Sequence, residues 1–442
     1  MTTATKPRRQ LGLFDATMIV MGGIVGAGIF ANPSEVAHRV HTPFLILGVW
    51  VVGGFIAMCG AFIWAELATR LPAAAGGQYV YLREAYHPAV AFMYGWGLLL
   101  ITQTGGMAAV AVIFASYFCA LTGANWNGSV IAAIALLTLT GINCFGARAG
   151  SNVQSVLMLL KIGAIAALVA IGFAVGYSST KSGALLGQPI SFGLLKSIGA
   201  AMVPVAFAYG GWQTATFVAG EMRDARRDLS RGLLIGVGGV VALYLAVNLA
   251  CLRVLGPAGL DATTTPASDV MRIALGERGA QWIAFAITIS TLGFLSQSML
   301  TAPRVYYAMA RDRLFFASVG KLSRQSGAPV VAIILQGVAA IIIACSGTYG
   351  EILNFEVTVD FIFFGMTAAA LFILRRRRIG SDTAIYRTPG HPFTTFLFVL
   401  SCAGIVISAV IASPRNSAIA LCIMLAAFPV YYFWSRFRGA RS

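Results

Sequence analysis

Long blocks of apolar residues, separated by short polar connections, are the main pattern along this chain of 442 residues. Most blocks approach or exceed the roughly 20 helical residues that cross a hydrocarbon layer of about 30 Å. Lipid offers the backbone no hydrogen-bond partners, so each block is expected to be an α-helix, whereas a membrane β-barrel would show short alternating segments. The pattern predicts an all-α integral membrane protein with about twelve transmembrane helices, near residues 14–37, 44–69, 89–121, 128–146, 152–176, 194–221, 231–255, 280–310, 329–346, 352–374, 394–412 and 416–434.

Composition agrees with this prediction. Of all residues, 58% are hydrophobic and 10% are charged, whereas soluble domains carry about 25% charged residues. So few charges cannot cover a surface that faces water. Because the connections are short, residues 1–442 are expected to form a single polytopic domain.

Lysine and arginine indicate the orientation, because they concentrate in the cytoplasmic loops of membrane proteins. With the N-terminus in the cytoplasm and an even number of spans, 23 of the 31 basic residues lie on the cytoplasmic side, 7 lie opposite, and Lys161 lies within a span. Both termini are therefore expected in the cytoplasm of a multi-pass plasma-membrane protein. The net charge of +16 follows from this distribution, and without a basic recognition helix it does not indicate nucleic-acid binding.

Cysteine and histidine indicate no cofactor. The seven cysteines lie inside or at the ends of apolar segments and form no CxxC pair, and the four histidines lie in or beside loops. This leaves no metal cluster and no disulfide framework. A nucleophile–base pair within the spans is missing as well, so the chain is not expected to be an enzyme.

Two predicted spans contain residues that interrupt a helix. Four glycines lie within Gly22–Phe30 in the first span, and the sixth span contains Pro204 followed by Gly210 and Gly211. Close helix packing would explain either segment alone. However, the two spans occupy matching places in two runs of five, which is the sequence pattern of transporters built from inverted repeats. Free N–H groups in the first span would bind a carboxylate, and free carbonyls in the sixth would bind an ammonium group, so the pair suits a zwitterionic amino acid.

Motifs along nearly the whole chain resemble the amino acid–polyamine–organocation superfamily, and within it the L-type amino acid transporter branch. The resemblance implies a LeuT-like fold with two inverted five-helix repeats, near 14–176 and 194–374, followed by two helices near 394–434. It also implies transport by alternating access. The segments that carry it are Gly22–Phe30, Ala65–Leu67, Gly76–Ala85, Phe207–Gln213, Arg304–Asp312 and Tyr386–Gly390.

The resemblance also assigns the substrate site. It implies that the amino group binds to carbonyls of Phe207, Ala208 and Gly210, that Phe207 closes over the substrate from outside, and that the neutral Gln213 disfavours cationic cargo. The turn that it implies for the substrate carboxylate consists of Val25, Gly26, Ala27, Gly28 and Ile29.

Lys161 is the one basic residue near the middle of a span. A charge at that depth costs several kcal/mol without partners, so a functional role is expected. Lys161 would either load and release a proton or stay charged against the loosened backbone of the first span. In the family, a lysine there takes the place of a bound sodium ion, with Tyr244 in the same network and Ser298 as a weaker candidate. Among the acidic residues only Asp360 comes near this depth, and we expect it nearer the end of the tenth span.

These observations predict a sodium-independent carrier of neutral, small L-amino acids, working as an exchanger. The alternatives are a proton-coupled symporter and, from another class, a channel, although no selectivity filter is visible. Animal members of the branch join a heavy chain through a cysteine after the third helix. Residues 122–128 contain no cysteine, so no such subunit is expected, and the short termini indicate a bacterial inner membrane. Glu66 with Arg70, and Glu221 with Arg223, are candidates for gate ion pairs or interface anchors.

Overall fold

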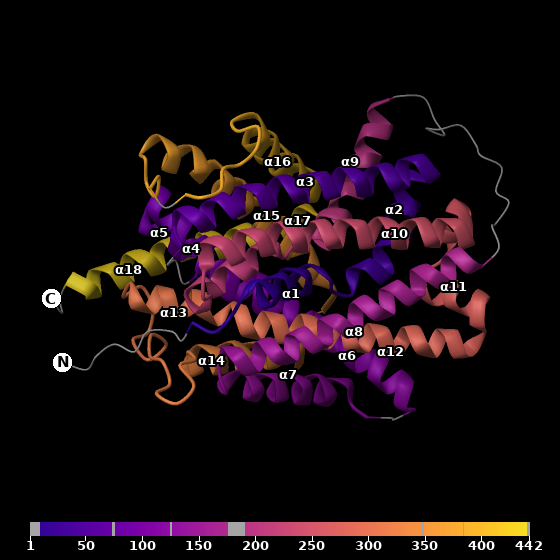
Figure 1. The fold of residues 1–442 in the computed structure, drawn as a ribbon, viewed down its shortest axis with the longest axis horizontal. Coiled ribbons are helices and arrows are strands. Elements are labelled where there is room, and N and C mark those ends of the chain that lie inside the picture. The colour runs from indigo at the N-terminus through magenta and orange to yellow at the C-terminus, as the bar shows by residue number, and fades with distance from the viewer. Residues whose placement is uncertain are drawn as a thin grey trace.

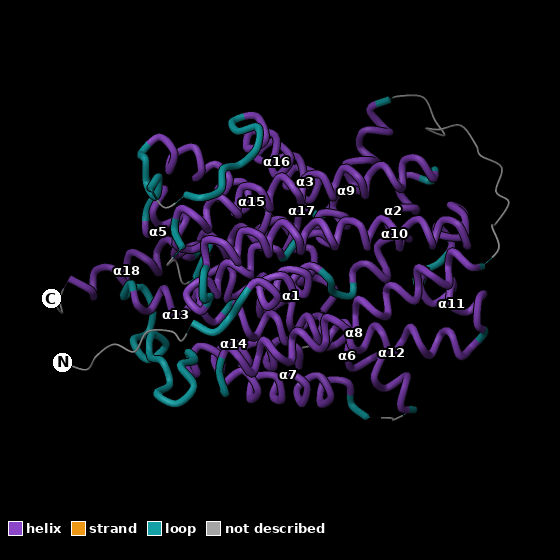
Figure 2. Tube along the Cα trace, viewed as in Figure 1, coloured by secondary structure: helices purple, strands orange, loops and turns teal. Residues whose placement is uncertain are grey.

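The computed structural model describes residues 9–72, 76–123, 126–175, 191–345, 349–382 and 384–439. Helices that run roughly side by side form nearly all of this part of the chain (Figure 1). Loops lie mainly at the two ends of the bundle (Figure 2). This arrangement satisfies the backbone within each helix, as an apolar surrounding requires.

The first half of the chain contains the helices that lead up to the second glycine-rich interruption. Their bounds are α1 (Leu13–Ile24), α2 (Gly28–Val40), α3 (Pro43–Arg70), α4 (Gln78–Ala85), α5 (Pro88–Gly97), η1 (Leu98–Thr102), α6 (Gln103–Thr122), α7 (Gly128–Cys144), α8 (Ala147–Ala174) and α9 (Phe192–Tyr209).

The second half begins with two short helices of other types and continues with α-helices to the end of the described chain. Their bounds are η2 (Trp212–Glu221), η3 (Ala225–Leu229), α10 (Ser230–Ala262), α11 (Pro266–Leu275), α12 (Glu277–Thr301), α13 (Pro303–Arg311), α14 (Val330–Cys345), α15 (Tyr349–Arg376), α16 (Phe393–Ala412), α17 (Pro414–Leu425) and α18 (Ala427–Gly439).

Each of the predicted apolar segments falls on one of these helices or on a consecutive group of them. Among the described residues, 9 helices are long and apolar enough to cross a membrane, and the bent pair α1 and α2 makes 10. The apolar helices α7 and α14 are shorter, with 17 and 16 residues. The chain is thus an all-helical membrane protein with 9 to 10 candidate spans.

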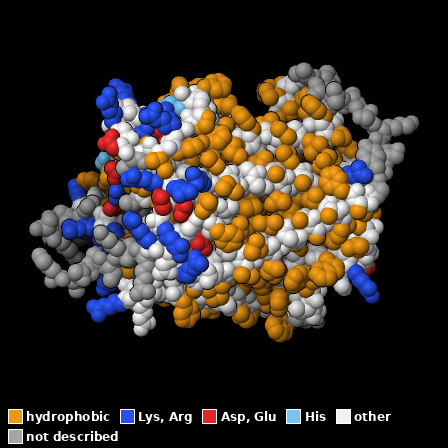
Figure 3. Space-filling model, in the orientation of Figure 1, with side chains coloured by type: hydrophobic (Ala, Val, Ile, Leu, Met, Phe, Trp, Pro, Cys, Tyr) orange, Lys and Arg blue, Asp and Glu red, His pale blue; other side chains and the backbone are white. Residues whose placement is uncertain are grey.

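The surface agrees with this conclusion. Apolar side chains cover the flank of the bundle that Figure 3 shows, while blue and red side chains gather mainly at the left end. The described chain begins and ends at that same end (Figure 1). Among the large apolar side chains on the outside are Phe55, Leu137, Leu160 and Ile342, each at least half exposed, as lipid-facing residues would be.

Candidate substrate site

The first interruption separates α1 from α2. α1 ends at Ile24, residues 25–27 are not helical, and α2 begins at Gly28 with its axis bent by 42° from that of α1. The first N–H groups of a helix have no partner inside it, and the helix dipole gives that end a partial positive charge. The N-terminus of α2 is therefore suited to bind an anionic group such as a carboxylate.

Side chains from three other helices bond to the carbonyls that this interruption releases. The Tyr244 hydroxyl of α10 donates to the Ile24 carbonyl at 3.1 Å, and the Lys161 Nζ of α8 donates to the Val25 carbonyl at 2.5 Å. Ser290 Oγ of α12 donates to the Gly26 carbonyl at 3.0 Å. Lys161 and Tyr244 are buried, so α8, α10 and α12 meet at consecutive residues of the first interruption.

The second interruption follows α9. This helix continues through Pro204 and ends at Tyr209, and Gly211 adopts a φ of 108° before η2 starts. A Cβ on Gly211 would lie 2.1 Å from the Gly23 carbonyl oxygen, so both the positive φ and the contact with α1 require glycine here. The freed carbonyls bond locally: Phe207 O accepts from Gly210 N at 3.2 Å, and Gly211 O accepts from Thr214 Oγ1 at 2.6 Å.

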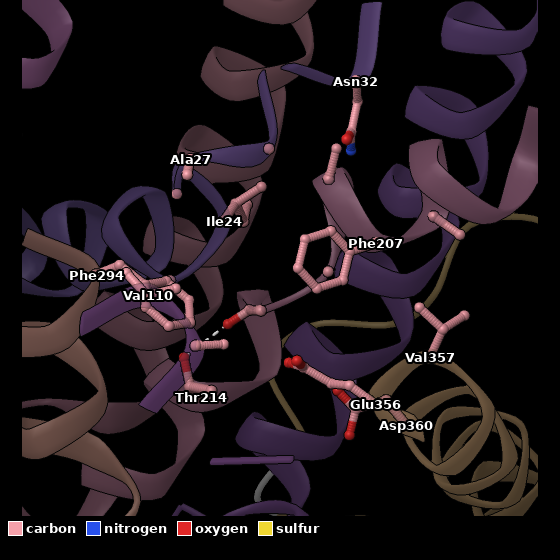
Figure 4. Close-up of a pocket in the computed structure, with 18 of the residues that line it drawn as sticks. Ile24, Ala27, Asn32, Val110, Phe207, Thr214, Phe294, Glu356, Val357 and Asp360 are labelled. Atoms are coloured by element: carbon pink, nitrogen blue, oxygen red, sulfur yellow. Dashed lines mark hydrogen bonds between the residues drawn. The ribbon is translucent and has the colours of Figure 1, made fainter. Parts of the chain in front are cut away.

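A cavity of about 170 Å³ lies between the two interruptions. Gly26 and Gly28 contribute to its wall from the first interruption, and Phe207 and Gly210 from the second. Figure 4 shows Ile24 and Ala27 on one side of this space and Phe207 across from them. The Asn32 amide Nδ2 donates to the Pro204 carbonyl at 2.8 Å, which joins α2 directly to α9.

The structure brings most of the predicted substrate residues to this cavity, but not all of them. Val25 and Ile29 are buried outside its wall. Ser298 is buried on α12, and its carbonyl accepts from Gln336. The hydroxyl of α12 that bonds to the first interruption is instead Ser290. The predicted substrate residues that line the cavity are Gly26, Ala27, Gly28, Phe207, Ala208, Gly210 and Gln213.

Sequence reasoning missed two acidic residues of the wall. Glu356 and Asp360 on α15 both line the cavity, and Figure 4 shows them next to each other below the ring of Phe207. Asp360, expected nearer the end of its span and without a role in the site, thus belongs to the cavity wall. Asn32 and Gln103 of the wall were missed as well. The four-residue spacing of Glu356 and Asp360, which puts both on one helix face, was the available signal.

Ion pairs connect helix ends near the end of the bundle that carries the termini. Glu66 binds Arg70 at 2.8 Å and Arg375 at 2.5 Å, so the predicted Glu66–Arg70 pair exists. Glu221 binds Arg304 at 2.9 Å, not the predicted Arg223, because η2 brings it beside α13. All these contacts lie away from the cavity wall.

A helical membrane protein with a cavity that contains polar groups between two interrupted helices has the architecture of a membrane carrier. The chain belongs to the amino acid permease family, whose model matches residues 11–432. This confirms the superfamily resemblance, and since the family consists of transporters, the chain is not an enzyme.

Similar proteins cover almost the whole chain. The serine/threonine exchanger SteT of Bacillus subtilis is 31% identical over 437 residues, which is 96% of each chain. The b(0,+)-type amino acid transporter 1 of Mus musculus is 26% identical, covering 97% of this chain and 88% of its own length. The large neutral amino acids transporter small subunit 2 of Homo sapiens is 26% identical, covering 96% and 80%.

Proposed function

We propose that this protein is a sodium-independent exchanger of small, neutral L-amino acids that works by alternating access. The observation that carries the proposal is the cavity between the two interruptions, bordered by the N-terminus of α2 and by Phe207, Ala208 and Gly210. A substrate carboxylate at α2 and an α-ammonium group at the carbonyl side of α9 would use the opposite polarity of the two helix ends. The substrate-binding role of these residues is part of the proposal.

Lys161 supports sodium independence. In this proposal its ammonium group acts as a fixed cation beside the Val25 carbonyl, where a bound sodium ion would otherwise compensate the freed backbone oxygen. The neutral Gln213 in the wall supports a neutral cargo, and the serine/threonine exchanger among the similar proteins supports a small one and exchange. Tyr244 and Ser298 stay candidates for coupling or gating, and Phe207 for closing the site.

The proposal includes finer features of the fold. We infer twelve crossings, with α7 and α14 spanning in addition to the long helices, and two inverted five-helix repeats followed by α16 and α17–α18. The carrier would lie in the plasma membrane, which we propose is a bacterial inner membrane. Both termini would then lie in the cytoplasm. The basic side chains at the terminus-bearing end in Figure 3 support this orientation. We expect no heavy-chain subunit.

Counterflow in proteoliposomes tests the function. Vesicles loaded with one unlabelled amino acid should accumulate the same labelled amino acid, with serine, threonine and alanine among the best of a panel. Replacing sodium by choline should leave the rate unchanged. A rate that disappears without sodium, or an ohmic conductance in place of saturable exchange, would contradict the proposal; the second result would indicate a channel.

A proton-coupled symporter is a second candidate, and the carboxylates of Glu356 and Asp360 in the cavity wall favour it. A symporter would accumulate amino acid against its gradient in empty vesicles when the outside is acidic. An obligatory exchanger would do so only when the vesicles contain amino acid.

A further inference from the structure

One wall of the cavity is formed by α15 and the start of α6. Unlike the wall formed by the two interruptions, it carries two carboxylates. Glu356 and Asp360 lie one helical turn apart, which places them on the same face of α15. Figure 4 shows the two side chains next to each other. One oxygen of Glu356, Oε2, is buried without a hydrogen-bond partner among the described residues.

Gln103 provides an independent sign that this wall binds something. The residue is 7% exposed and lines the cavity, and its amide oxygen has no hydrogen-bond partner in the described structure. Gln103 follows directly on the π-helical turn η1, and single π-turns occur often at functional sites. Gly106, one turn further along α6, leaves room for Glu356: an added Cβ would lie 3.2 Å from Glu356 Oε2.

No basic side chain of the described residues lines this wall beside the two carboxylates. Among the described residues that line the cavity there is no lysine, arginine, histidine, tyrosine or cysteine. Tyr94 of α5 is buried outside the wall, and a phenol brings no positive charge. The charged side chains on helices packed against α15 all lie outside the wall: Glu66, Arg70, Arg83, Glu84, Lys196 and Arg415.

Two carboxylates at close range resist full ionisation, and they resist it more strongly when water is removed, because sharing one proton removes their repulsion. A zwitterionic amino acid cannot replace that proton, because its ammonium group comes with a carboxylate and its net charge is zero. Substrate binding also removes water from the cavity, which makes the second negative charge more costly. Protonation of the pair and binding of a neutral amino acid should therefore favour each other.

We propose that Glu356 and Asp360 form a shared proton site in the central cavity, which takes up one proton from the solvent when a neutral amino acid binds. The proton forms an O–H bond on one carboxylate and is hydrogen-bonded to the other, and it is released when the substrate leaves. This inference rests on the proposed function, since it takes the cavity as the substrate site. It applies to both modes: an exchanger would carry a proton with the amino acid in each direction, and a symporter would use the proton gradient.

Equilibrium binding of tritiated L-serine to the purified full-length protein, measured from pH 5.5 to 8.5, tests the site. If binding takes up one proton, Kd rises with pH, by up to about tenfold per unit once the empty pair has lost its proton. Glu356→Gln and Asp360→Asn are permanently neutral at one position. In each variant the Kd for serine should no longer depend on pH. At pH 8.5 each variant should bind serine with the affinity of the unaltered protein at pH 5.5. A merely structural role would weaken binding at every pH instead.

Glu35→Gln is the matched control, because Glu35 pairs with Arg39 on the surface and is not part of the cavity wall; it should keep the slope. A flat Kd in the unaltered protein, or a slope that persists in both cavity variants, would overturn the inference while leaving exchange intact. Preference for L-ornithine over L-serine, lost in Glu356→Gln, would also overturn it, since the carboxylates would then hold a substrate ammonium group. If no amino acid of the counterflow panel binds at any pH, the proposed function itself fails.

Discussion

The two interrupted helices satisfy their freed backbone carbonyls in different ways. At the first interruption, three consecutive carbonyls accept hydrogen bonds from Tyr244, Lys161 and Ser290, which belong to three other helices. At the second, the carbonyls of Phe207 and Gly211 bond within the same stretch of chain. The geometry of the first interruption therefore depends on the surrounding helices, while that of the second depends on the backbone freedom of glycine.

The two interruptions should therefore be sensitive to different kinds of substitution. Distant side-chain substitutions should change the first interruption and hardly affect the second. Backbone substitutions should do the reverse. Each prediction below changes one kind of support and is checked by counterflow for the site and by thermal unfolding for the fold.

The largest effect is expected from Gly211→Ala. The new Cβ would meet the Gly23 carbonyl oxygen at 2.1 Å, in a residue held at a φ of 108°. The backbone strain alone costs about 1–3 kcal/mol, and α1 and η2 would have to move apart. We expect counterflow to fall by at least about 100-fold, which is the effect of 2.8 kcal/mol at about 1.4 kcal/mol per factor of ten.

Gly404→Ala on α16 is the control for this substitution, because a Cβ there meets nothing within 4 Å. It should leave transport unchanged and thermal stability equal or slightly higher, since alanine favours helix over glycine. Normal counterflow in Gly211→Ala would show that the second interruption does not rely on its glycine.

Lys161→Met is expected to have the next largest effect. Methionine keeps a flexible apolar stem but loses the charge-assisted hydrogen bond to the Val25 carbonyl, which is worth roughly 1.5–3 kcal/mol. Counterflow should fall by about 10–100-fold, without the loss of fold expected for a clash. Lys196→Met on α9 is the control, because Lys196 is an exposed lysine. Unchanged transport in Lys161→Met would remove the main support for the fixed-cation role.

Much of this architecture could be predicted from the sequence, because helix formation in lipid depends on local composition. The apolar segments, the glycine-rich interruptions and the isolated Lys161 are local features, and all have counterparts in the structure. The exact end of α9 is less local: the chain stays helical through Pro204, and the helix ends at Tyr209, just before Gly211 approaches Gly23.

The remaining features depend on helix rotation and on long-range packing. Glu356 and Asp360 lie within an apolar segment, and only the orientation of α15 turns both toward the cavity. The pairing of Glu221 with Arg304 joins residues 83 positions apart. Likewise, Ser290 rather than Ser298 reaches the first interruption because α12 crosses α1 at that depth. None of these orientations follows from hydropathy.

A smaller effect is expected from Tyr244→Phe. The substitution keeps the ring contacts with Trp50 and Tyr209 and removes only the hydroxyl that donates to the Ile24 carbonyl. Hydrogen bonds between membrane helices contribute about 0.6 kcal/mol on average and up to about 1.7, so counterflow should fall by about 3- to 15-fold. A double variant with Lys161→Met measures whether the two donors act together: a combined loss equal to the product of the single losses would mean that the carbonyls are held independently.

The smallest effect on the fold is expected from Gly26→Ala, which tests the comparison most directly. Gly26 has no positive φ that would require glycine, and an added Cβ would come no closer than 3.6 Å to the ring of Phe294. Thermal stability should therefore stay within the range of Gly404→Ala, in contrast to Gly211→Ala. Because Gly26 lines the cavity, the extra methyl group should instead narrow the range of substrates, reducing threonine counterflow more than alanine counterflow. Loss of stability as large as that of Gly211→Ala would mean that the first interruption also depends on glycine. The three side-chain donors would then bind to a backbone geometry that they do not determine.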